Sequence, residues 1–379
     1  MKWLAVLILP LTAAAPAASA QREPAVRYVI TELPPASAAS AGASINNLGW
    51  VAGQTGGEVV RATLWRGGRP TDLGDLGGPN SAVLWPVKND RGIVVGIAQT
   101  AATDERKEAW SCGAFIPVTG NVCRGFVWQH GVMRALSTHG GTHGFATGAN
   151  NRGLVVGWAE VAAADPSCNA PQVLGFRAAT WDTTDRDRIR DLPPLAGDSA
   201  SAATAVNDRG LVVGISGSCA DAVGGFSARH AVLWENGRPR DLGGFGGTAW
   251  NTPMAVNDWG MVVGFANSDT AVGDAFDYRA FVWTTWAGFR HLGPPDLKAQ
   301  ALGVNNLGQV VGLCRLPTGQ AAVLWQHGRM IDLNDDAVDS GYQGRLRYAN
   351  DINDRGVITG QARNTAGQFV TFVATPVRR

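Results

Sequence analysis

One short cassette, Asn-(Asn/Asp)-x-Gly-x-x-x-Gly, recurs seven times along the chain and constrains the fold more than any other feature. The first glycines of successive cassettes lie 43, 61, 57, 50, 48 and 48 residues apart. Internal periods of this length indicate a propeller, a solenoid or an array of small units. The cassettes occupy residues 45–53, 88–96, 149–157, 206–214, 256–264, 304–312 and 352–360.

Each cassette predicts a β-hairpin. Its Asn and its first Gly stand at the first and fourth positions of a type I turn, where Gly is free to take a positive φ. β-Branched residues such as Val212 and Val213 then favour a strand. A second hairpin follows, as in residues 230–243, where Trp234 closes one strand and Asn236-Gly237 forms the turn. Each repeat therefore predicts four short antiparallel strands.

A tryptophan closes the third predicted strand in six of the seven repeats. The third strand of the last repeat, residues 369–373, lacks it. Large aromatic side chains at one repeated position favour packing between repeats over stacking on a ligand. We expect packing between blades for Trp65, Trp128, Trp181, Trp234, Trp283 and Trp325.

The two ends of the chain predict a closed ring. The seventh repeat runs out before its fourth strand, and Tyr28 to Leu33 resembles the strand that ends the other repeats. A closed ring requires that an N-terminal strand of this kind complete the last repeat, and an open solenoid does not. We therefore expect an all-β chain in which residues 21–379 form one seven-bladed β-propeller of four-stranded antiparallel blades. An N-terminal strand completes the C-terminal blade and leaves no open sheet edge.

These motifs resemble those of the bacterial HAF-repeat family of probable extracellular proteins. That family combines His-Ala-Phe-Leu-Trp, Asp-Leu-Gly-x-Leu-Gly-Gly and the Asn-(Asn/Asp)-x-Gly cassette, and the nearest copies here are residues 230–234, 72–78 and 241–247. The resemblance implies an exported repeat protein and brings no catalytic residues with it. Arg replaces the family's His in most repeats, so a role tied to that His is in doubt.

The first twenty residues have the pattern of a secretory signal peptide. Lys2 precedes an apolar stretch from Trp3 to Leu11 and a run of small residues that ends at Ala20. The apolar stretch is half the length that a membrane span requires. We expect a bacterial protein secreted to the periplasm or outside the cell, with no membrane span and a monomeric state. With 32 basic and 31 acidic residues, the chain carries no nucleic-acid footprint.

Export makes the five cysteines candidates for disulfides. Cys112 and Cys123 flank one loop, so a local bridge is the simplest pairing. Cys168 and Cys219 fall in equivalent loops of neighbouring repeats and form a second candidate pair, although four cysteines allow three connectivities. Cys314 is then a buried free thiol.

Loop length points to one raised side of the ring. The segments from cassette to tryptophan are longest in repeats two to five, and function tends to lie on loops that a rigid scaffold holds. Their charged and aromatic residues suit a glycan or a protein ligand, although each could equally be a solvated loop residue. The candidates are Asp104, Glu105, Arg106, Lys107, Trp110, Trp158, Glu160, Asp269, Asp274, Asp277 and Tyr278.

A basic side chain recurs four residues before the tryptophan in five repeats. Such a ring of cations could receive the carboxylates of an acidic polysaccharide. The alternative is that each pairs inside its own blade, for instance with Asp72, Asp191 or Asp241, and repeat-wide recurrence favours this structural role. The residues are Arg61, Arg124, Arg177, His230 and Arg279.

His139 and His143 flank a Gly-Gly-Thr link and could bind a metal. A glycine-rich loop does not fix two imidazoles as a helix would, and no third ligand is evident, so we expect surface or hydrogen-bonded histidines and no metal. Residues 182–187 lack the Gly and the distal Glu of an EF-hand loop. The cassettes, too, are predicted to be turns that use their polar side chains locally rather than calcium sites.

No enzyme signature is present: the chain has no Gly-x-Ser-x-Gly, His-Glu-x-x-His, phosphate loop or Cys-x-x-Cys. We expect a non-catalytic binding or interaction module without a cofactor, presenting its ligand surface on the long loops of repeats two to five. The alternative is a propeller hydrolase or lyase acting on extracellular or cell-surface polysaccharide. The low-ranked site candidates are Trp110, Arg124, His139, His143, Arg177, His230 and Arg279.

Overall fold

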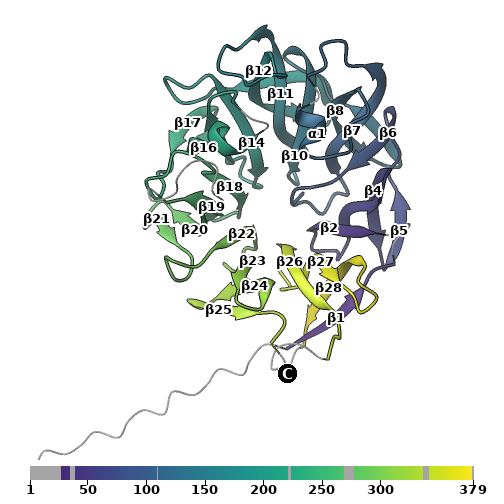
Figure 1. Cartoon of the computed structure of the whole chain (residues 1–379), viewed down its shortest axis with the longest axis vertical. Coiled ribbons are helices and arrows are strands. Elements are labelled where there is room, and N and C mark those ends of the chain that lie inside the picture. The colour runs from purple at the N-terminus through teal and green to yellow at the C-terminus, as the bar shows by residue number, and fades with distance from the viewer. Residues whose placement is uncertain are drawn as a thin grey trace, which may run out of the picture.

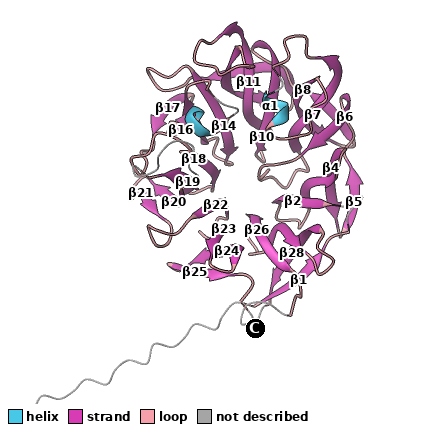
Figure 2. Cartoon of the chain, viewed as in Figure 1, coloured by secondary structure: helices cyan, strands magenta, loops and turns pink. Residues whose placement is uncertain are grey.

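The chain folds into a ring of seven four-stranded antiparallel sheets around a central axis, which confirms the predicted β-propeller (Figure 1). The computed structural model describes residues 27–34, 39–108, 110–220, 223–268, 277–335 and 341–377. The predicted signal peptide and the candidates Asp269 and Asp274 lie outside these residues. Strands make up nearly all of the regular structure (Figure 2), with one short helix, α1 (Trp110–Gly113), and one 3-10 turn, η1 (Gly225–Ser227). Within the described residues, no helix is long and apolar enough to cross a membrane.

The blades follow one another in sequence order, and the first six each run as a meander from the axis outward. Blade 1 holds β2 (Ser40–Ile45), β3 (Val51–Gly56), β4 (Val60–Arg66) and β5 (Arg69–Asp72), and blade 2 holds β6 (Gly77–Ala82), β7 (Val94–Thr103), β8 (Asn121–Gln129) and β9 (Val132–Ala135). Blade 3 holds β10 (Gly140–Ala149), β11 (Leu154–Ala164), β12 (Leu174–Asp182) and β13 (Asp185–Leu192), and blade 4 holds β14 (Ala200–Val206), β15 (Val212–Gly217), β16 (His230–Glu235) and β17 (Arg238–Asp241). Blade 5 holds β18 (Thr252–Val256), β19 (Val262–Asn267), β20 (Tyr278–Thr284) and β21 (Gly288–His291), and blade 6 holds β22 (Ala299–Val304), β23 (Val310–Leu316), β24 (Gly319–Gln326) and β25 (Arg329–Asp332).

The seventh blade closes the ring as the sequence predicts. It holds β26 (Arg345–Ile352), β27 (Ile358–Arg363) and β28 (Phe369–Pro376) from the C-terminal repeat. The N-terminal strand β1 (Tyr28–Glu32) pairs with β28 as its outermost strand, with Tyr28 opposite Pro376 and Glu32 opposite Phe372. The first and last strands of the described chain therefore lock each other in one sheet.

The two glycine positions of each cassette require glycine for different structural reasons. The first has a φ between +70° and +85° in all seven cassettes, as at Gly210, so it closes the turn in a conformation that other residues avoid. The second faces a bulge in the innermost strand, as at Gly214, where an added Cβ would collide with the carbonyl oxygen of Ala202. In every other cassette, a Cβ at the second glycine would likewise collide with a carbonyl oxygen of the innermost strand.

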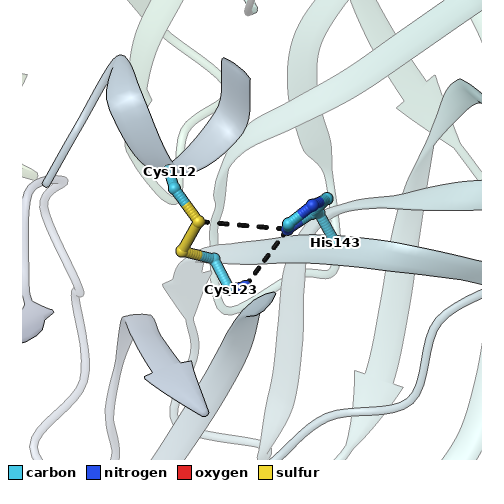
Figure 3. Close-up of side chains that lie close together, drawn as sticks. All are labelled: Cys112, Cys123 and His143. Atoms are coloured by element: carbon cyan, nitrogen blue, oxygen red, sulfur yellow. Dashed lines mark hydrogen bonds between the residues drawn. A yellow bond between two sulfur atoms is a disulfide. The ribbon is translucent and has the colours of Figure 1, made fainter. Parts of the chain in front are cut away.

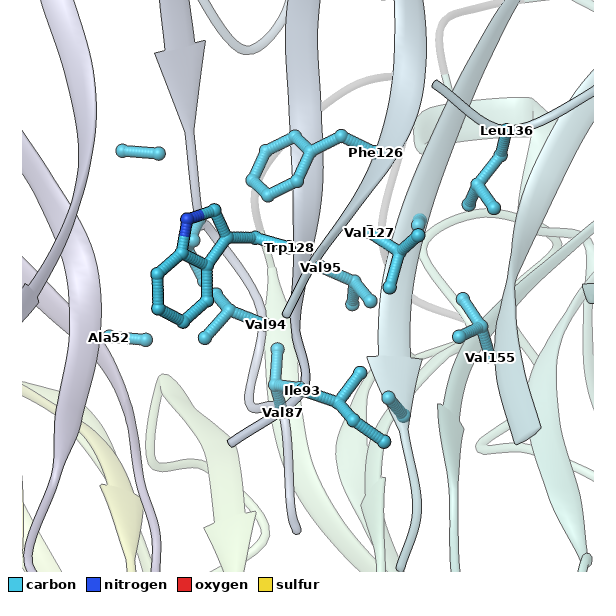
Figure 4. Close-up of a cluster of buried hydrophobic side chains, with 14 of the residues drawn as sticks. Ala52, Val87, Ile93, Val94, Val95, Phe126, Val127, Trp128, Leu136 and Val155 are labelled. Carbon is cyan, nitrogen blue, oxygen red and sulfur yellow. The ribbon is translucent and has the colours of Figure 1, made fainter. Parts of the chain in front are cut away.

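The predicted tryptophans pack between blades. All six are at most 5% exposed. The indole N–H groups of Trp65, Trp181 and Trp234 donate to the carbonyls of Pro34, Ser137 and Pro193, which lie in the link from the preceding blade. Figure 4 shows Trp128 in a cluster that runs from Ala52 of blade 1 to Val155 of blade 3. The apolar core is thus continuous from one blade to the next.

Both predicted disulfides are present, and Cys314 is free and buried. Cys112–Cys123 ties α1 to β8 within blade 2. Cys168–Cys219 joins the loop after β11 to the loop after β15 and so links blade 3 to blade 4. Burial raises the pKa of the Cys314 thiol to about 11, so the thiol stays protonated at neutral pH.

The glycine geometry predicts that Gly214→Ala destabilises the protein by about 2–4 kcal/mol, because the new methyl group forces the bulged strand away. Gly57→Ala is the matched control, since Gly57 has open space at its Cβ position and a change within about 0.5 kcal/mol is expected. Urea denaturation of both variants measures the difference. Equal stabilities would contradict this explanation of the second glycine.

Candidate functional site

The two faces of the ring differ in what they carry. The cassette turns and the turns between third and fourth strands open on one face, which we call the cassette face. The loops between second and third strands and the links between blades open on the other, the loop face. Both faces have to be examined, because ligand sites in propellers lie at either mouth of the channel or on the flanking loops.

The first asparagine of each cassette is used locally, as predicted. At Asn207, the side-chain oxygen accepts from the backbone N–H of Arg209 and Leu211 at 3.0 and 2.9 Å. The same pair of bonds recurs in the other six cassettes. The amide of Asn207 also donates to the carbonyl of Asn257 in the next blade at 2.9 Å.

For the second cassette residue, the prediction that its side chain is used only locally is wrong. Its backbone N–H donates to the side-chain oxygen of its counterpart one blade further on, as Asn151 does to Asp208 at 2.8 Å. All seven blades repeat this bond at 2.8 or 2.9 Å, and Asp354 donates to Asn47 to close the circle. We call this circle the cassette ring; its members are Asn47, Asp90, Asn151, Asp208, Asp258, Asn306 and Asp354.

In blade 2 a longer segment between the inner strand β6 and the cassette enters the channel beneath this ring. Ala82 pairs with Ile97 as Ala202 of blade 4 pairs with Ile215, but the cassette asparagine follows seven positions later in blade 2 and five in blade 4. The two extra residues send Trp85 across the channel, where it packs against apolar side chains of blades 5 and 6. Its ring also meets Phe115 and Phe145 edge-on at 5.5 and 5.4 Å.

Lys88 crosses the channel from the same segment. Its ammonium group lies 2.8 Å from a carboxylate oxygen of Asp351, which is fully buried in blade 7, and it donates to the carbonyls of Val304 and Ile352 at 2.8 and 2.6 Å. Burial raises the pKa of Asp351, and the nearby Lys88 opposes that rise. The cavity that remains between Lys88 and the cassette ring measures about 60 Å³, so the channel is largely filled by the chain itself.

On the loop face, the long loops of blades 2 to 4 are joined into one raised unit, which we call the loop body (residues 104–120, 165–173 and 218–229, as far as they are described). A carboxylate oxygen of Glu108 accepts from the backbone N–H groups of Val173 and Leu174, both at 2.8 Å, which ties blade 2 to blade 3. The Cys168–Cys219 disulfide ties blade 3 to blade 4. These loops are therefore held in fixed positions relative to one another.

Buried ionisable side chains lie beneath the loop body. Glu160 accepts from the backbone N–H groups of Thr142 and His143 at 3.0 and 2.8 Å, and from the Gln172 amide at 3.0 Å. Burial, together with the nearby carboxylate of Glu108, raises the pKa of Glu160 to about 8. Glu160 is therefore largely protonated at neutral pH, which limits the negative charge buried there.

His143 belongs to this buried group (Figure 3). Its Nδ1 accepts from the backbone N–H of Cys123 at 3.1 Å, so the ring proton is assigned to Nε2, which lies 3.2 Å from Asp104. Burial lowers the pKa of His143 despite the Asp104 carboxylate. The ring is fully buried, so it braces the link between blades 2 and 3 rather than facing a ligand.

The two histidines of the Gly-Gly-Thr link do not share surroundings. Asp191 and Arg177 act electrostatically on His139, whereas Asp104, Glu108 and Arg124 act on His143. Among the described residues, two groups of three side chains bring potential metal-ligand atoms close together. The first group is Cys112, Cys123 and His143, and the second is Asp165, Cys168 and Cys219. Each set contains a disulfide, whose sulfurs are bonded to each other.

Three of the predicted surface residues are buried, so that prediction is wrong for them: Asp104, Trp158 and Glu160 are at most 3% exposed. The reason is that β11 extends to Ala164, which places Trp158 and Glu160 inside the sheet, while Asp104 turns inward to His143. Glu105, Arg106 and Lys107 are exposed as expected. Trp110 lies in α1, and its side chain is outside the described part. Asp277 pairs with Arg279, and the half-buried Tyr278 packs against an apolar cluster.

The recurring basic residues occupy one register of the third strand but find separate local partners. Arg61 pairs with Asp72 and Asp75 at 3.0 Å each, and His230 lies 3.2 Å from Asp241. Arg279 pairs with Asp277 at 2.7 Å, and Arg124 donates to the Thr138 hydroxyl at 3.3 Å. Arg177 acts electrostatically on Asp165 and His139. The alternative, pairing within the blade or capping of a backbone carbonyl, therefore describes Arg61, His230 and Arg279, and these side chains do not form one open cationic surface.

Sequence reasoning missed Trp85 and Lys88. Two signals were available: Lys88 stands where the other cassettes have an apolar residue or Ala, and the segment before the cassette is longer than in blade 4. Neither signal reveals that the side chains cross to blades on the far side of the ring. That outcome depends on the diameter of the closed channel.

No protein-family model and no curated protein matches the chain. Among solved structures, the β-propeller domain of the Trilobed protease from Pyrococcus furiosus is similar at 6% identity, over 92% of this chain and 94% of that chain, with a TM-score of 0.48. The Pyrococcus horikoshii acylaminoacyl peptidase aligns at 9% identity with a TM-score of 0.51, over 90% of this chain and 52% of that chain. The present chain thus spans about half the length of that peptidase. At such identities the likeness concerns the fold alone.

Removing the Lys88 ammonium group from the channel should destabilise the protein. We expect Lys88→Met to destabilise the protein by about 3–5 kcal/mol, because Asp351 is left buried without its partner. Without Lys88 the pKa of Asp351 in the folded chain should rise further, and a carboxyl group with a raised pKa contributes less to protein stability as pH rises. The destabilisation by K88M should therefore be larger at pH 8 than at pH 5. Urea denaturation of K88M and K88M/D351N at both pH values tests this. Lys298→Met, at an exposed pair, is the control and should change stability by less than about 1 kcal/mol.

The buried Glu160 predicts a second pH effect. Its pKa in the folded chain is about 8 and its ordinary value is 4.5, so the folded state binds its proton more tightly and its contribution to stability falls as pH rises between these values. Glu160→Gln should remove this part of the slope, because Gln does not ionise. Denaturation midpoints at pH 5, 6.5 and 8 measure it, with exposed Glu105→Gln as control. Parallel profiles for E160Q and wild type would contradict the assignment.

Proposed function

We propose that this chain is an exported, non-catalytic binding module whose ligand surface is the loop body of blades 2 to 4. The observation that carries the proposal is the joining of three long loops by a disulfide and by the Glu108 hydrogen bonds. Loops held in one conformation lose little entropy when they bind, and this favours recognition. A ring that needed only to fold could connect these strands with the short loops found in blades 1 and 6.

The outer surface of the loop body has the composition of a protein-binding site. Val118 is 62% exposed, Val173 45% and Phe226 40%, and Arg106 and Lys107, in the same loop as Val118, are exposed as well. Protein interfaces combine exposed apolar side chains of this kind with arginine and other polar groups. We therefore propose a protein partner in the cell envelope for this surface.

The alternative, a hydrolase or lyase on polysaccharide, requires catalytic side chains that a substrate can reach. His143 is fully buried, and its surroundings differ from those of His139. Trp85 and Lys88 fill the channel in which propeller enzymes can assemble a site from several blades. These observations support binding over catalysis. The likeness to peptidase propellers adds no activity to this chain.

We extend the proposal to export. The two disulfides are compatible with an extracellular location, and residues 1–20 have the pattern of a signal peptide. The cassettes and the Asp-Leu-Gly links support membership of the HAF-repeat family. In this proposal the mature chain begins at Gln21.

The test is binding of the mature protein to a bacterial envelope fraction. We expect Val118→Asp to weaken binding about tenfold or more, because it replaces the most exposed large apolar side chain that the structure describes in the loop body by a charge. Val132→Asp is the matched control, since Val132 is 48% exposed in the same blade but lies in the outer strand β9, outside the loop body. Equal loss in both variants, or in neither, would count against the loop body as the ligand surface.

A further inference from the structure

Two exposed tryptophans stand on blade 5 of the cassette face, opposite the loop body. Trp259 is 71% exposed and Trp286 is 87% exposed, the largest exposed fractions of any aromatic side chain among the described residues. Trp259 occupies the third cassette position, in the turn between β18 and β19. Trp286 lies in the turn between β20 and β21, on the same face.

Trp286 is an addition to the repeat. The third and fourth strands of five other blades are joined by two-residue turns, as Glu235 opposite Arg238 shows. In blade 5 the flanking pair is Thr284 and Gly288, which leaves three residues with Trp286 in the middle. A turn needs no tryptophan, and an indole left in water is unfavourable unless something covers it.

Trp259 is held in place although it is exposed. Its indole N–H donates to the carbonyl of Asn306 in blade 6 at 3.0 Å, and the guanidinium of Arg209 from blade 4 lies 5.3 Å from its ring centroid. In blades 2 and 7 an arginine makes the equivalent bond across blades: Arg91 to Asn151 and Arg355 to Asn47. Trp259 thus keeps the structural bond of this position and adds an aromatic surface fixed in orientation.

The two turns that carry the indoles are separated by two strand-to-strand steps of the sheet, about 10 Å at about 4.8 Å each. That separation is close to the length of a disaccharide unit in an extended polysaccharide. Asp258, the neighbour of Trp259 in the chain, is half-buried, and its carboxylate oxygens accept from the Asp208 N–H and the Asn306 amide but keep further lone pairs for sugar hydroxyls. Arg209 lies over the Trp259 ring and Asp258 precedes it in the chain, so both signs of charge flank this indole, which favours an uncharged ligand.

We propose that Trp259 and Trp286 form a binding site for an uncharged polysaccharide chain, with the C–H faces of successive pyranose rings packed on the two indoles. This site is separate from the loop body and goes beyond the proposed function. The module would then hold a glycan on one face and a protein on the other. The cassette face around Trp259 consists of short turns, so an extended polymer can lie across it without meeting long loops.

The experiment measures retention of the mature protein on crystalline cellulose and chitin, together with affinity electrophoresis in soluble unsubstituted xylan and β-glucan. We expect wild type to bind at least one of these polymers and Trp286→Ala to weaken that binding about tenfold or more. Trp259→Arg is the decisive variant: it restores the residue of four other cassettes and the donor across blades but removes the indole. It should keep the wild-type melting temperature and lose binding as W286A does.

The outcomes are separable from those for the loop body. Val118→Asp should bind the polysaccharide like wild type, whereas W286A should retain the envelope protein partner. If no polymer binds, or if W259R and W286A both bind like wild type, the proposal is wrong. Envelope binding that requires Trp286 and disappears after protease treatment of the envelope would assign this face to a protein instead and would also overturn it.

Discussion

The cassette ring is the interaction on which the rest of the structure depends. Each second cassette residue gives its backbone N–H to a side-chain oxygen in the next blade, so seven sheets are held in register by seven bonds and the last bond closes the circle. Only Asn and Asp place an oxygen at this reach, because their carbonyl is one methylene from the backbone. Either serves, since the neighbour requires only an acceptor.

The order of Asn and Asp around the ring also has an electrostatic reason. Carboxylates placed side by side repel, and an asparagine between them supplies a donor amide, as Asn47 does to both Asp90 and Asp354. A ring of seven members cannot alternate completely, so one pair of like neighbours is unavoidable. That pair is Asp208 and Asp258, and the exposed Trp259 stands directly beside it in the chain. With four aspartates among seven members, one adjacent pair of carboxylates is the minimum, and the ring has that minimum.

Once the ring closes, its interior is too narrow to remain an open channel in this chain. Trp85 and Lys88 reach residues of blades on the far side because the ring brings those blades within one side-chain length. The loop body shows the same principle on the outside, where Glu108 of blade 2 meets Val173 of blade 3. Both proposed ligand surfaces therefore lie on the two outer faces of the ring.

Much of the fold was predictable from residues close in sequence, whereas the site was not. The turns and the strand-ending tryptophans follow from local patterns that recur in seven and in six repeats, and the closing strand follows from comparing the two ends of the chain with those repeats. The disulfide pairs were the simplest of three possible connectivities, and the structure confirms them. Asp104, Trp158 and Glu160 were expected at the surface because they lie between a cassette and a tryptophan in long segments rich in polar residues. They are buried because β11 continues further than its counterparts in blades 1, 4 and 5, and because His143, from a different blade, covers Asp104.

The sequence by itself determined the number of blades, their strand order and the closure of the ring. A turn depends on the identity of about four consecutive residues, and the same turn residues recur in each repeat. Only the tertiary structure decided which side chains face water and which cross to another blade. Lys88 and Asp351 are 263 positions apart, so their pairing depends on the diameter of the closed ring. Asp104 and Glu105 are neighbours in one polar loop, yet the first is 3% exposed and the second is exposed, because His143 of the next blade covers only Asp104.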